Sequence, residues 1–369
     1  MTQMIGIAEI KLTESEIDAA VAVLKSGNLR QGPQCDAFEK EFAAHVGAKL
    51  GMTSSSGSSA LHLPYLALLQ PGDEVLVPSF TFIATASMVS YAGGKPIFVD
   101  VDPNTFLIDL EDAERKITPK TVAISPVHLF GNPCDRPAVE GFAKRHNLKI
   151  VWDAAQAHGA AYDSVDVGAW NDVVAYSFYL SKNMFVGEGG MTTTNDPELD
   201  KQMRLYRSHG VAGKYNHVVL GLNYRMTDVE AAIGREQLKR LDSMLAIRRA
   251  NAVVLNAGLG QMAGITIQEL TPGGAHAWHQ YCILVDEAEF GCGRDELADR
   301  LQKRGVQSGV HYPRGLHQQL AYIEQQGEST LPVTERLAET ILALPVHHGM
   351  GTKEAQMVVD AIADSRTGA

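Results

Sequence analysis

Two polar residues, each following an apolar run, are the strongest chemical signal in this sequence. Asp153 ends the run 148–152, and Lys182 lies shortly after the run 173–178; both runs are typical of buried strands. Adjacent parallel strands place their carboxyl ends side by side, so an amine and a carboxylate can reach one ligand. An amine can hold an aldehyde as a Schiff base, and a carboxylate can keep a ring nitrogen protonated. The pair predicts a pyridoxal 5'-phosphate site with Lys182 and Asp153 as catalytic residues.

Each of these residues has a simpler interpretation when it is taken alone. A lysine beside Asn and Gly is usually a solvated loop charge, and an Asp at a strand end is usually an N-cap for the next helix. The joint pattern decides between the interpretations. It runs strand, Asp, small residues, strand, Ser, Lys and then the turn Gly-Glu-Gly-Gly at 187–190, which favours the cofactor site.

A serine-rich loop supplies a candidate phosphate site. The segment 54–59, Ser-Ser-Ser-Gly-Ser-Ser, opens directly into a helical pattern. Hydroxyls and free backbone N–H groups at a helix N-terminus bind phosphate readily. Taken alone, such a loop is better explained as a flexible segment with an N-cap. Beside the Lys and Asp pair, we assign Gly57, Ser58 and Ser59 to the cofactor.

Further residues are expected around the cofactor from their positions in the chain. Ser177 offers a hydroxyl at a strand end, and Gln156, one turn after Asp153, can hydrogen-bond the phenolic oxygen of the cofactor. Phe82 can lie flat on the ring, although an aromatic residue there is more often plain core. The three glycines of the turn, Gly187, Gly189 and Gly190, permit the positive φ angles that a tight turn needs.

Composition and charge restrict the class of protein. A chain of 369 residues suggests two domains at about 150 residues each. A net charge of −11 without basic blocks argues against nucleic acid or an anionic membrane as partner. No apolar run is long enough to span a bilayer, and the N-terminus lacks a secretory signal. The four cysteines form no Cys-x-x-Cys pair, so no metal site is expected. We expect a soluble, cytoplasmic protein.

From residue 57 onward, strand and helix patterns alternate, which implies a mostly parallel sheet covered on both faces. Strands are expected at 74–78, 96–101, 122–127, 148–152 and 173–178, and helices at 61–69, 83–91, 139–145 and 197–208. A long helical pattern over 226–258 leads towards a smaller α+β part, with strands at 278–285 and 306–310 and helices at 294–304 and 333–342. We divide the chain into a large domain, 1–245, and a small domain, 246–369.

Several motifs in one order resemble a known family, the DegT/StrS-type pyridoxal phosphate enzymes. The most specific are 153–159, Asp-Ala-Ala-Gln-Ala-His-Gly, and the lysine segment 177–190. The others are 26–33, 78–85, 221–227 and 309–317, so the resemblance covers nearly the whole chain. It implies an α/β fold of type I, in which a large domain with a mostly parallel seven-stranded sheet carries a smaller C-terminal α+β domain.

The resemblance also implies a sugar aminotransferase that uses pyridoxal 5'-phosphate. The amino group would pass from L-glutamate or L-glutamine to a keto sugar, with a nucleotide-linked 4-keto-6-deoxy sugar favoured. The enzyme would be a homodimer with shared sites, in which Asn223 contacts the cofactor of the partner chain. The residues that would contact substrate are Asn28, Arg30, Tyr179, Arg225, His311, Tyr312 and His317.

Two departures from the family pattern bear on these expectations. The family commonly has Gly-Thr where this chain has Gly57-Ser58, which keeps the hydroxyl, and often His where this chain has Tyr179. The second change concerns the identity of the substrate rather than the cofactor. Two alternatives stay open, a family member acting on a cyclitol or other non-nucleotide ketone and a catalytically silent regulator. The intact lysine and Asp153 favour transamination.

Overall fold

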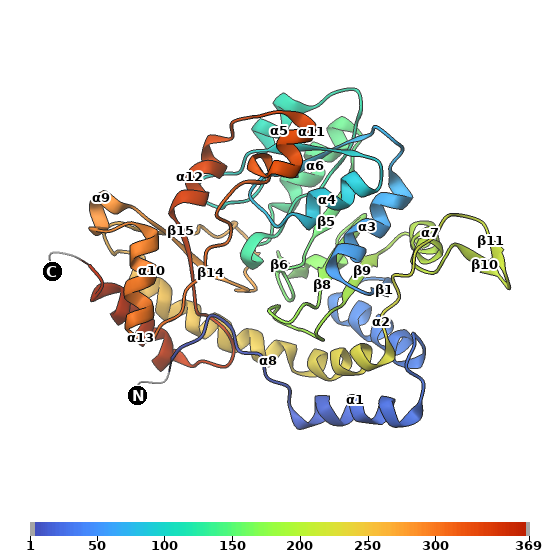
Figure 1. Cartoon of the computed structure of the whole chain (residues 1–369), viewed down its shortest axis with the longest axis horizontal. Helices are drawn as coiled ribbons and strands as arrows, with labels where there is room; N and C mark the ends of the chain where they lie inside the picture. The colour runs from blue at the N-terminus through green and yellow to red at the C-terminus, as the bar shows by residue number, and fades with distance from the viewer. Residues whose placement is uncertain (1–3, 367–369) are drawn as a thin grey trace.

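A seven-stranded sheet is the centre of the computed structural model, which describes residues 4–366 (Figure 1). Its strand order is β1-β9-β8-β5-β4-β2-β3. The strands are β1 Leu50–Ser54, β2 Glu74–Pro78, β3 Lys95–Val99, β4 Thr121–Ile124, β5 Lys149–Asp153, β8 Val173–Ser177 and β9 Gly190–Thr194. All of these pairings are parallel except those of β9, which is antiparallel to both β8 and β1. The predicted mostly parallel sheet is therefore confirmed.

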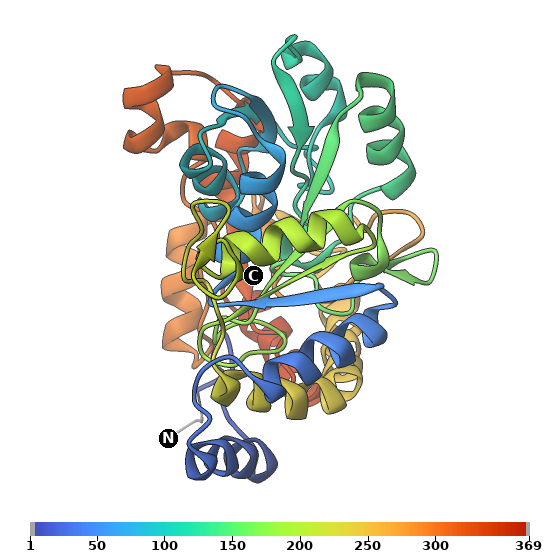
Figure 2. The same cartoon turned by 90° about the vertical axis from the view of Figure 1, so that its right-hand side faces the viewer.

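Helices cover both faces of this sheet because its strands are apolar on both sides. In β5, Ile150 and Trp152 belong to one buried cluster and Val151 belongs to the other. Figure 2 shows α7 and α2 on opposite sides of the edge strand β1. One cluster draws on α3 (Gly57–Leu68), α4 (Ala84–Tyr91) and α7 (Pro197–Arg207); the other draws on α2 (Pro33–Val46), α5 (Leu110–Lys116), α6 (Arg136–His146) and α8 (Asp228–Leu259).

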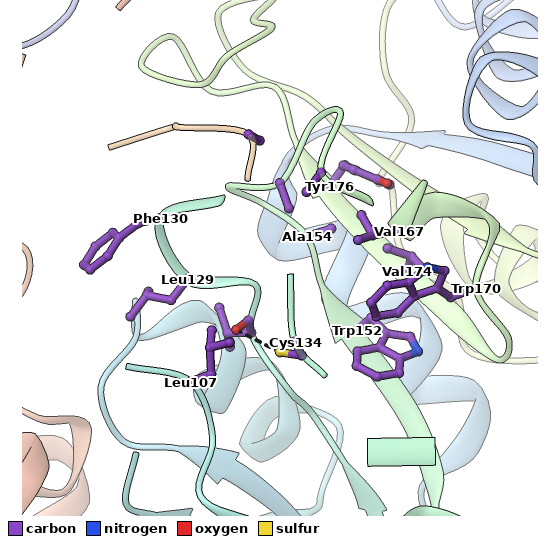
Figure 3. Packing of buried hydrophobic residues seen from close by; sticks show 14 of the residues in the cluster. Leu107, Leu129, Phe130, Cys134, Trp152, Ala154, Val167, Trp170, Val174 and Tyr176 are labelled. Carbon is purple, nitrogen blue, oxygen red and sulfur yellow. Dashed lines mark hydrogen bonds between the residues drawn. The ribbon is translucent and has the colours of Figure 1, made fainter. Parts of the chain in front are cut away.

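A tryptophan pair fills the core directly below the carboxyl end of β5 (Figure 3). The rings of Trp152 and Trp170 pack edge to face with centroids 4.8 Å apart, and both side chains are fully buried. Beside them the thiol of Cys134 donates to the carbonyl of Val127 at 3.4 Å. Dense packing of large rings leaves little room for movement. The next residue along β5, Asp153, is therefore held on a rigid base.

The C-terminal part contains a second, smaller sheet. Strands β12 (Ile265–Ile267), β14 (Tyr281–Val285) and β15 (Ile341–Leu344) pair antiparallel and pack against α10 (Arg294–Lys303) and α13 (Thr352–Ala363). Ile5 joins this second core, and the 32-residue helix α8 contributes to both cores. The division of the chain after residue 245 falls inside α8 and stays a proposal.

Some expected elements differ from those in the structure. The strand expected at 306–310 is wrong, because Val306 and Gly309 form only isolated bridges, to Ile5 and Ala343 respectively. The helix expected at 333–342 ends earlier, and its last residues begin β15. The other elements are α1 Glu14–Ser26, β6 Ala161–Tyr162, β7 Val165–Asp166, β10 Val211–Gly213, β11 Asn216–His217, β13 Gly274–Ala275, α9 Glu287–Phe290, α11 Leu320–Gln326, α12 Pro332–Thr340 and the short 3-10 helices Leu129–Gly131, Val167–Ala169 and Leu316–Gln318.

Candidate active site

The carboxyl ends of β5 and β8 lie side by side, as predicted. The two strands are parallel neighbours in which Asp153 is paired with Ala175. A cavity of about 410 Å³ opens above them and is lined by both Asp153 and Lys182. The first residues of α3 and the segments around residues 82, 280 and 312 complete its wall. Ligands of open α/β sheets bind at this edge, which makes the cavity the candidate active site.

Asp153 is a carboxylate held in place by hydrogen bonds, and it forms no ion pair within residues 4–366. Its side chain accepts a hydrogen bond from the Thr85 hydroxyl at 2.7 Å and another from the Ala155 N–H at 3.0 Å. Burial raises the pKa of Asp153, while the two hydrogen bonds and the charge of Lys182 act against that rise. A buried carboxylate is stabilised by a cation placed beside it. A protonated pyridine nitrogen meets that need, so Asp153 fits the predicted cofactor.

Lys182 has the properties of an amine that can react at neutral pH. Burial lowers the pKa of Lys182 to about 8, although the carboxylate of Asp153 acts in the opposite direction. At pH 7 about a tenth of the amine is therefore uncharged, against less than about a thousandth for an ordinary lysine. An uncharged amine is the form that attacks an aldehyde and accepts a proton.

Gln156 is locked by two hydrogen bonds. Its carbonyl oxygen accepts from the N–H of Phe130 at 2.6 Å, and its amide nitrogen donates to the hydroxyl of Tyr312 at 3.1 Å. The amide nitrogen carries two protons, so one of them is left for a ligand. This arrangement fits a hydrogen bond to the phenolic oxygen of the cofactor. The role itself stays a prediction.

The serine-rich loop forms the N-terminus of α3 at the cavity. Ser56 is the N-cap, and its hydroxyl accepts from the N–H of Ser59 at 3.1 Å. The hydroxyl of Ser59 returns to the backbone of Ser56, so Ser59 is occupied by capping and does not line the cavity. Gly57 and Ser58 do line it, together with Ser177. These residues form a cradle that suits a phosphate group.

The glycines near the lysine are required for two different reasons. Only Gly187 has a positive φ, +104°, so our expectation for Gly189 and Gly190 was wrong. Those two are needed for close packing instead. A Cβ on Gly190 would lie 2.2 Å from the carbonyl oxygen of Ser56, and one on Gly189 would lie 2.7 Å from Met226. Gly190 thus lets β9 approach the loop that forms the N-terminus of α3.

The candidate substrate residues fall into two groups. Tyr179, His311 and Tyr312 line the cavity, as does the half-exposed ring of Phe82, which lies 6.3 Å from that of Tyr312. The others lie outside the set of lining residues: Asn28, Arg30, Arg225 and His317, and so does Asn223, which was predicted to contact the cofactor of the partner chain. Their roles as ligands stay predictions.

His317 is occupied by a buried chain of hydrogen bonds away from the cavity. Its Nδ1 lies 2.7 Å from the hydroxyl of Ser79, and its Nε2 lies 3.1 Å from a carboxylate oxygen of Glu335. Both ring nitrogens are therefore engaged by protein groups. The geometry favours a structural role for His317, which ties the small 3-10 helix to the end of β2.

Several lining residues were not identified from the sequence. They are Ser56, Leu61, Thr81, Ala84, Val127, Ala155, Ser181, Glu188, His279 and Gln280. His279 and Gln280 lie at the start of the strand predicted at 278–285, and nothing in that pattern pointed to the cavity.

Within residues 4–366, no group of three or more His, Cys, Asp or Glu side chains could hold a metal ion. Over the same residues, no helix is long and apolar enough to cross a membrane.

Comparison with known structures and sequences agrees with this geometry. The structure of DesV from S. venezuelae in complex with a ketimine intermediate matches with a TM-score of 0.94, 37% identity and 98% coverage of each chain. Helicobacter pylori PseC, an aminotransferase involved in pseudoaminic acid biosynthesis, matches with a TM-score of 0.92, 26% identity and coverage of 99% of this chain and 99% of that one. The fold and the cavity thus define a pyridoxal phosphate-dependent aminotransferase of fold type I.

The family can be stated more narrowly. Residues 11–363 match the model of the DegT/DnrJ/EryC1/StrS aminotransferase family, and the chain belongs to this family. The dTDP-3-amino-3,4,6-trideoxy-alpha-D-glucose transaminase of Streptomyces venezuelae is 39% identical over 94% of this chain and 91% of its own length. GDP-perosamine synthase of Caulobacter vibrioides is 37% identical over 88% of each. The resemblance expected from the motifs is confirmed.

The close approach of β9 to the N-terminus of α3 yields a first prediction. Gly190→Ala should weaken pyridoxal phosphate binding by about 5- to 150-fold, because forcing an extra methyl against fixed backbone typically costs about 1–3 kcal/mol. Titration of the apoenzyme with cofactor, followed by absorbance, measures the affinity. Gly141→Ala, on the covering helix α6, is the matched control, since its added Cβ would meet only the flexible end of Arg145, at 3.9 Å. Wild-type affinity in Gly190→Ala would contradict this view of the cradle.

Proposed function

We propose that this enzyme transfers an amino group from L-glutamate or L-glutamine to a nucleotide-linked keto sugar. The observation that carries the proposal is the meeting of Lys182 and Asp153 in one cavity of a chain of this family. The names of relatives support the substrate class. They include a dTDP-linked amino sugar transaminase, a UDP-N-acetyl-3-dehydro-alpha-D-glucosamine 3-aminotransferase and a GDP-perosamine synthase.

In this proposal, different residues of the cavity have different roles in transamination. When bound, pyridoxal phosphate supplies an aldehyde for the amine and a ring that draws in the electron pair left by a lost proton. Asp153 would keep the ring nitrogen protonated, and the remaining amide proton of Gln156 would hold the phenolic oxygen. The amine of Lys182 would take the proton from the α-carbon of the donor and later return one to the product carbon.

A substrate panel tests the proposal. Keto sugars linked to dTDP, UDP and GDP are each incubated with glutamate or glutamine, and the products are identified by mass spectrometry. We expect one nucleotide-linked sugar to gain an amino group, with 2-oxoglutarate or its amide formed in equal amount. The resemblance favours a 4-keto-6-deoxy sugar, whereas the names of two relatives specify position 3, so NMR of the product assigns the carbon.

One alternative keeps the chemistry and changes the acceptor. A structure of 3-amino-5-hydroxybenzoic acid synthase is 28% identical with a TM-score of 0.89, and its name specifies a product that is not a sugar. The panel therefore includes free cyclitol ketones. Turnover of such a ketone, with none of any nucleotide sugar, would overturn the proposed substrate class and leave the aminotransferase assignment intact.

The proposed homodimer rests on an exposed hairpin and on the segment that follows it. The hairpin of β10 and β11 projects from the body of the molecule, and Tyr215 and Leu220 are almost fully exposed in and next to it (Figure 1). The segment that follows the hairpin, 221–227, is anchored beside the serine-rich loop, since the N–H of Ser55 donates to the carbonyl of Tyr224 at 2.8 Å. Exposed apolar groups of this kind often mark a protein interface. A second copy of the chain is the proposed occupant, and it would bring Asn223 and Arg225 to the neighbouring site.

Mixing two inactive variants tests whether sites are shared. Lys182→Ala and Arg225→Ala chains are combined in equal amounts and allowed to exchange subunits. In a mixed dimer with shared sites, one site carries both defects and the other carries neither, so about a quarter of all sites should recover. Activity per site and the exchange, followed by mass spectrometry, are measured together. Proven exchange without recovery would mean that Arg225 serves the site of its own chain or no site.

A further inference from the structure

The segment 277–280 connects the C-terminal part of the molecule to the 3-10 turn Leu129–Gly131, which contacts Gln156. The backbone N–H groups of His279 and Gln280 both donate to the carbonyl of Phe130, at 2.9 and 3.2 Å, and the N–H of Ala277 donates to the carbonyl of Gly131 at 2.9 Å. The N–H of Phe130 in turn donates to Gln156. His279 and Gln280 also line the cavity. The segment is therefore part of the active-site wall and is fixed to it by several backbone contacts.

The same segment holds the residue that follows the reactive lysine. Asn183 is 1% exposed, and its amide nitrogen donates to the carbonyl of Ala277 at 2.9 Å. That bond sets the orientation of the amide, so its oxygen faces Nδ1 of His279 at 3.4 Å. An amide oxygen only accepts hydrogen bonds, so His279 must carry its proton on Nδ1. Nε2 of this neutral imidazole is then unprotonated, and the residue lines the same cavity as Lys182.

A buried arginine supports this segment from below. Arg248 lies on α8, is 4% exposed and donates to the carbonyls of Trp278 at 2.9 Å and His279 at 3.3 Å. Across residues 4–366, no ion pair joins Arg248 to a carboxylate. A buried cation without an anion is unfavourable, and here it is used to fix the backbone at His279. Such an arrangement is expected where the position of a side chain matters.

We propose that His279 is a positioning residue for Lys182, acting through Asn183. The contact from His279 to Asn183 and the bond from Asn183 to Ala277 hold the chain directly after the lysine, and thereby keep its amine inside the cavity. Without this connection the lysine loop would move, and the amine would reach water. The inference draws its importance from the proposed role of Lys182 but concerns only where this amine is held.

The charges around His279 should keep its contact with Asn183 in place across neutral pH. Burial lowers the pKa of His279 well below its ordinary value, and the neighbouring Lys182, Arg248, His158 and His311 lower it further. Since these neighbours are cationic or become so on protonation, the imidazole stays neutral across neutral pH. The tautomer of this neutral ring is then set by the contact with Asn183. The connection should hold throughout the range in which the amine of Lys182 titrates.

Competitive acetylation of the cofactor-free protein tests the proposal. A trace of acetic anhydride is added at pH values from 6 to 10, and acetylation of the Lys182 peptide is quantified by mass spectrometry. The wild-type midpoint should lie near the lowered pKa of about 8. His279→Leu should raise the midpoint by about one unit, because an amine that reaches water is charged more readily; this is a tenfold fall in neutral amine at pH 7. His279→Asn should keep the wild-type midpoint, since its amide N–H replaces Nδ1–H.

Two further variants test whether His279 acts through Asn183 and whether the shift of the midpoint is specific to this histidine. Asn183→Leu should shift the midpoint as His279→Leu does, and the double variant should shift it no further, because both changes break one connection. His347→Leu is the matched control. This buried histidine of the C-terminal part lies outside the lining residues and contacts the carbonyl of Gly6 and the N–H of Gly349. It should lower the melting temperature and leave the midpoint in place.

Three outcomes would overturn the proposal. They are an unchanged midpoint in natively folded His279→Leu, additive shifts in the double variant, and an equal shift in His347→Leu. Circular dichroism checks the fold of each variant, and His279→Asn supplies the comparison if the leucine variant does not fold, since a shift in natively folded His279→Asn would also count against it. The measurement contains neither cofactor nor substrate, so it can fail while the aminotransferase proposal stands, and the reverse also holds.

Discussion

Lys182→Ala should reduce transamination by a factor of at least about 10³, since it removes the group that attaches the cofactor and moves the proton. Stopped-flow absorbance of the half-reaction with glutamate measures the loss. The fold should persist, because a smaller side chain at the cavity wall leaves the two cores untouched. Lys201→Ala is the matched control: Lys201 is an exposed lysine on α7, 3.7 Å from Glu198, and its loss should not change the rate.

Borohydride treatment of the wild-type enzyme with cofactor identifies the attachment point directly. Reduction should fix the cofactor to the peptide that contains Lys182, and the label should be absent from Lys182→Ala. A label on Lys201 or Lys214 instead would contradict the assignment. The result does not depend on the identity of the sugar.

Asp153→Asn should lower the turnover rate by about 10²–10³ with little change in stability. The loss of one preorganised charge at a reacting centre typically has an effect of that size. An amide of equal size can still accept the hydrogen bond from Ala155, so the turn after β5 is kept. Steady-state kinetics and a melting curve are measured together. Turnover close to that of wild type would mean that another residue keeps the ring nitrogen of the cofactor protonated. Unfolding would show that the main role of Asp153 is structural.

Asp153→Asn should also change the pKa of Lys182, in the direction opposite to that expected for His279→Leu. The carboxylate of Asp153 raises the pKa of Lys182, so its removal should move the acetylation midpoint of the cofactor-free protein below pH 8. Loss of His279 is expected to move that midpoint upwards. The two variants therefore separate the loss of a neighbouring charge from the loss of positioning. Asp109→Asn, at the N-cap of α5, is a control outside the residues that line the cavity.

The sequence identified the parts of the fold whose patterns are local. The run 148–152 and the strand 74–78 are apolar and bounded by breakers, and both form strands within a residue of the expected bounds. β9 was missed because Gly-Met-Thr-Thr-Thr is neither strongly apolar nor alternating. β15 was missed because Ile341 and Leu342 continue the apolar spacing of the preceding helix.

The site shows the same division between local and distant information. Asp153 and Lys182 were predicted together because each follows its own strand and the strands are neighbours. His279 belongs to a segment almost a hundred residues further on, and only the folded backbone brings it to Asn183. The need for Gly190 also has a tertiary cause, since the Ser56 carbonyl that it faces is distant in sequence. Packing between remote segments leaves no signal in a single sequence.

The length of α8 limits how the molecule can be divided. At 1.5 Å per residue its 32 residues span about 48 Å, and one uninterrupted helix supplies Leu241 to the first core and Leu255 to the second. Melting either core exposes part of the helix that the other core needs, so the two should lose structure cooperatively. A cut after residue 245 would divide this helix and separate the strands of the second core from the first half of α8, which is packed in the first core. A replacement of the C-terminal part must therefore be joined at the loops around that part, so that α8 stays whole.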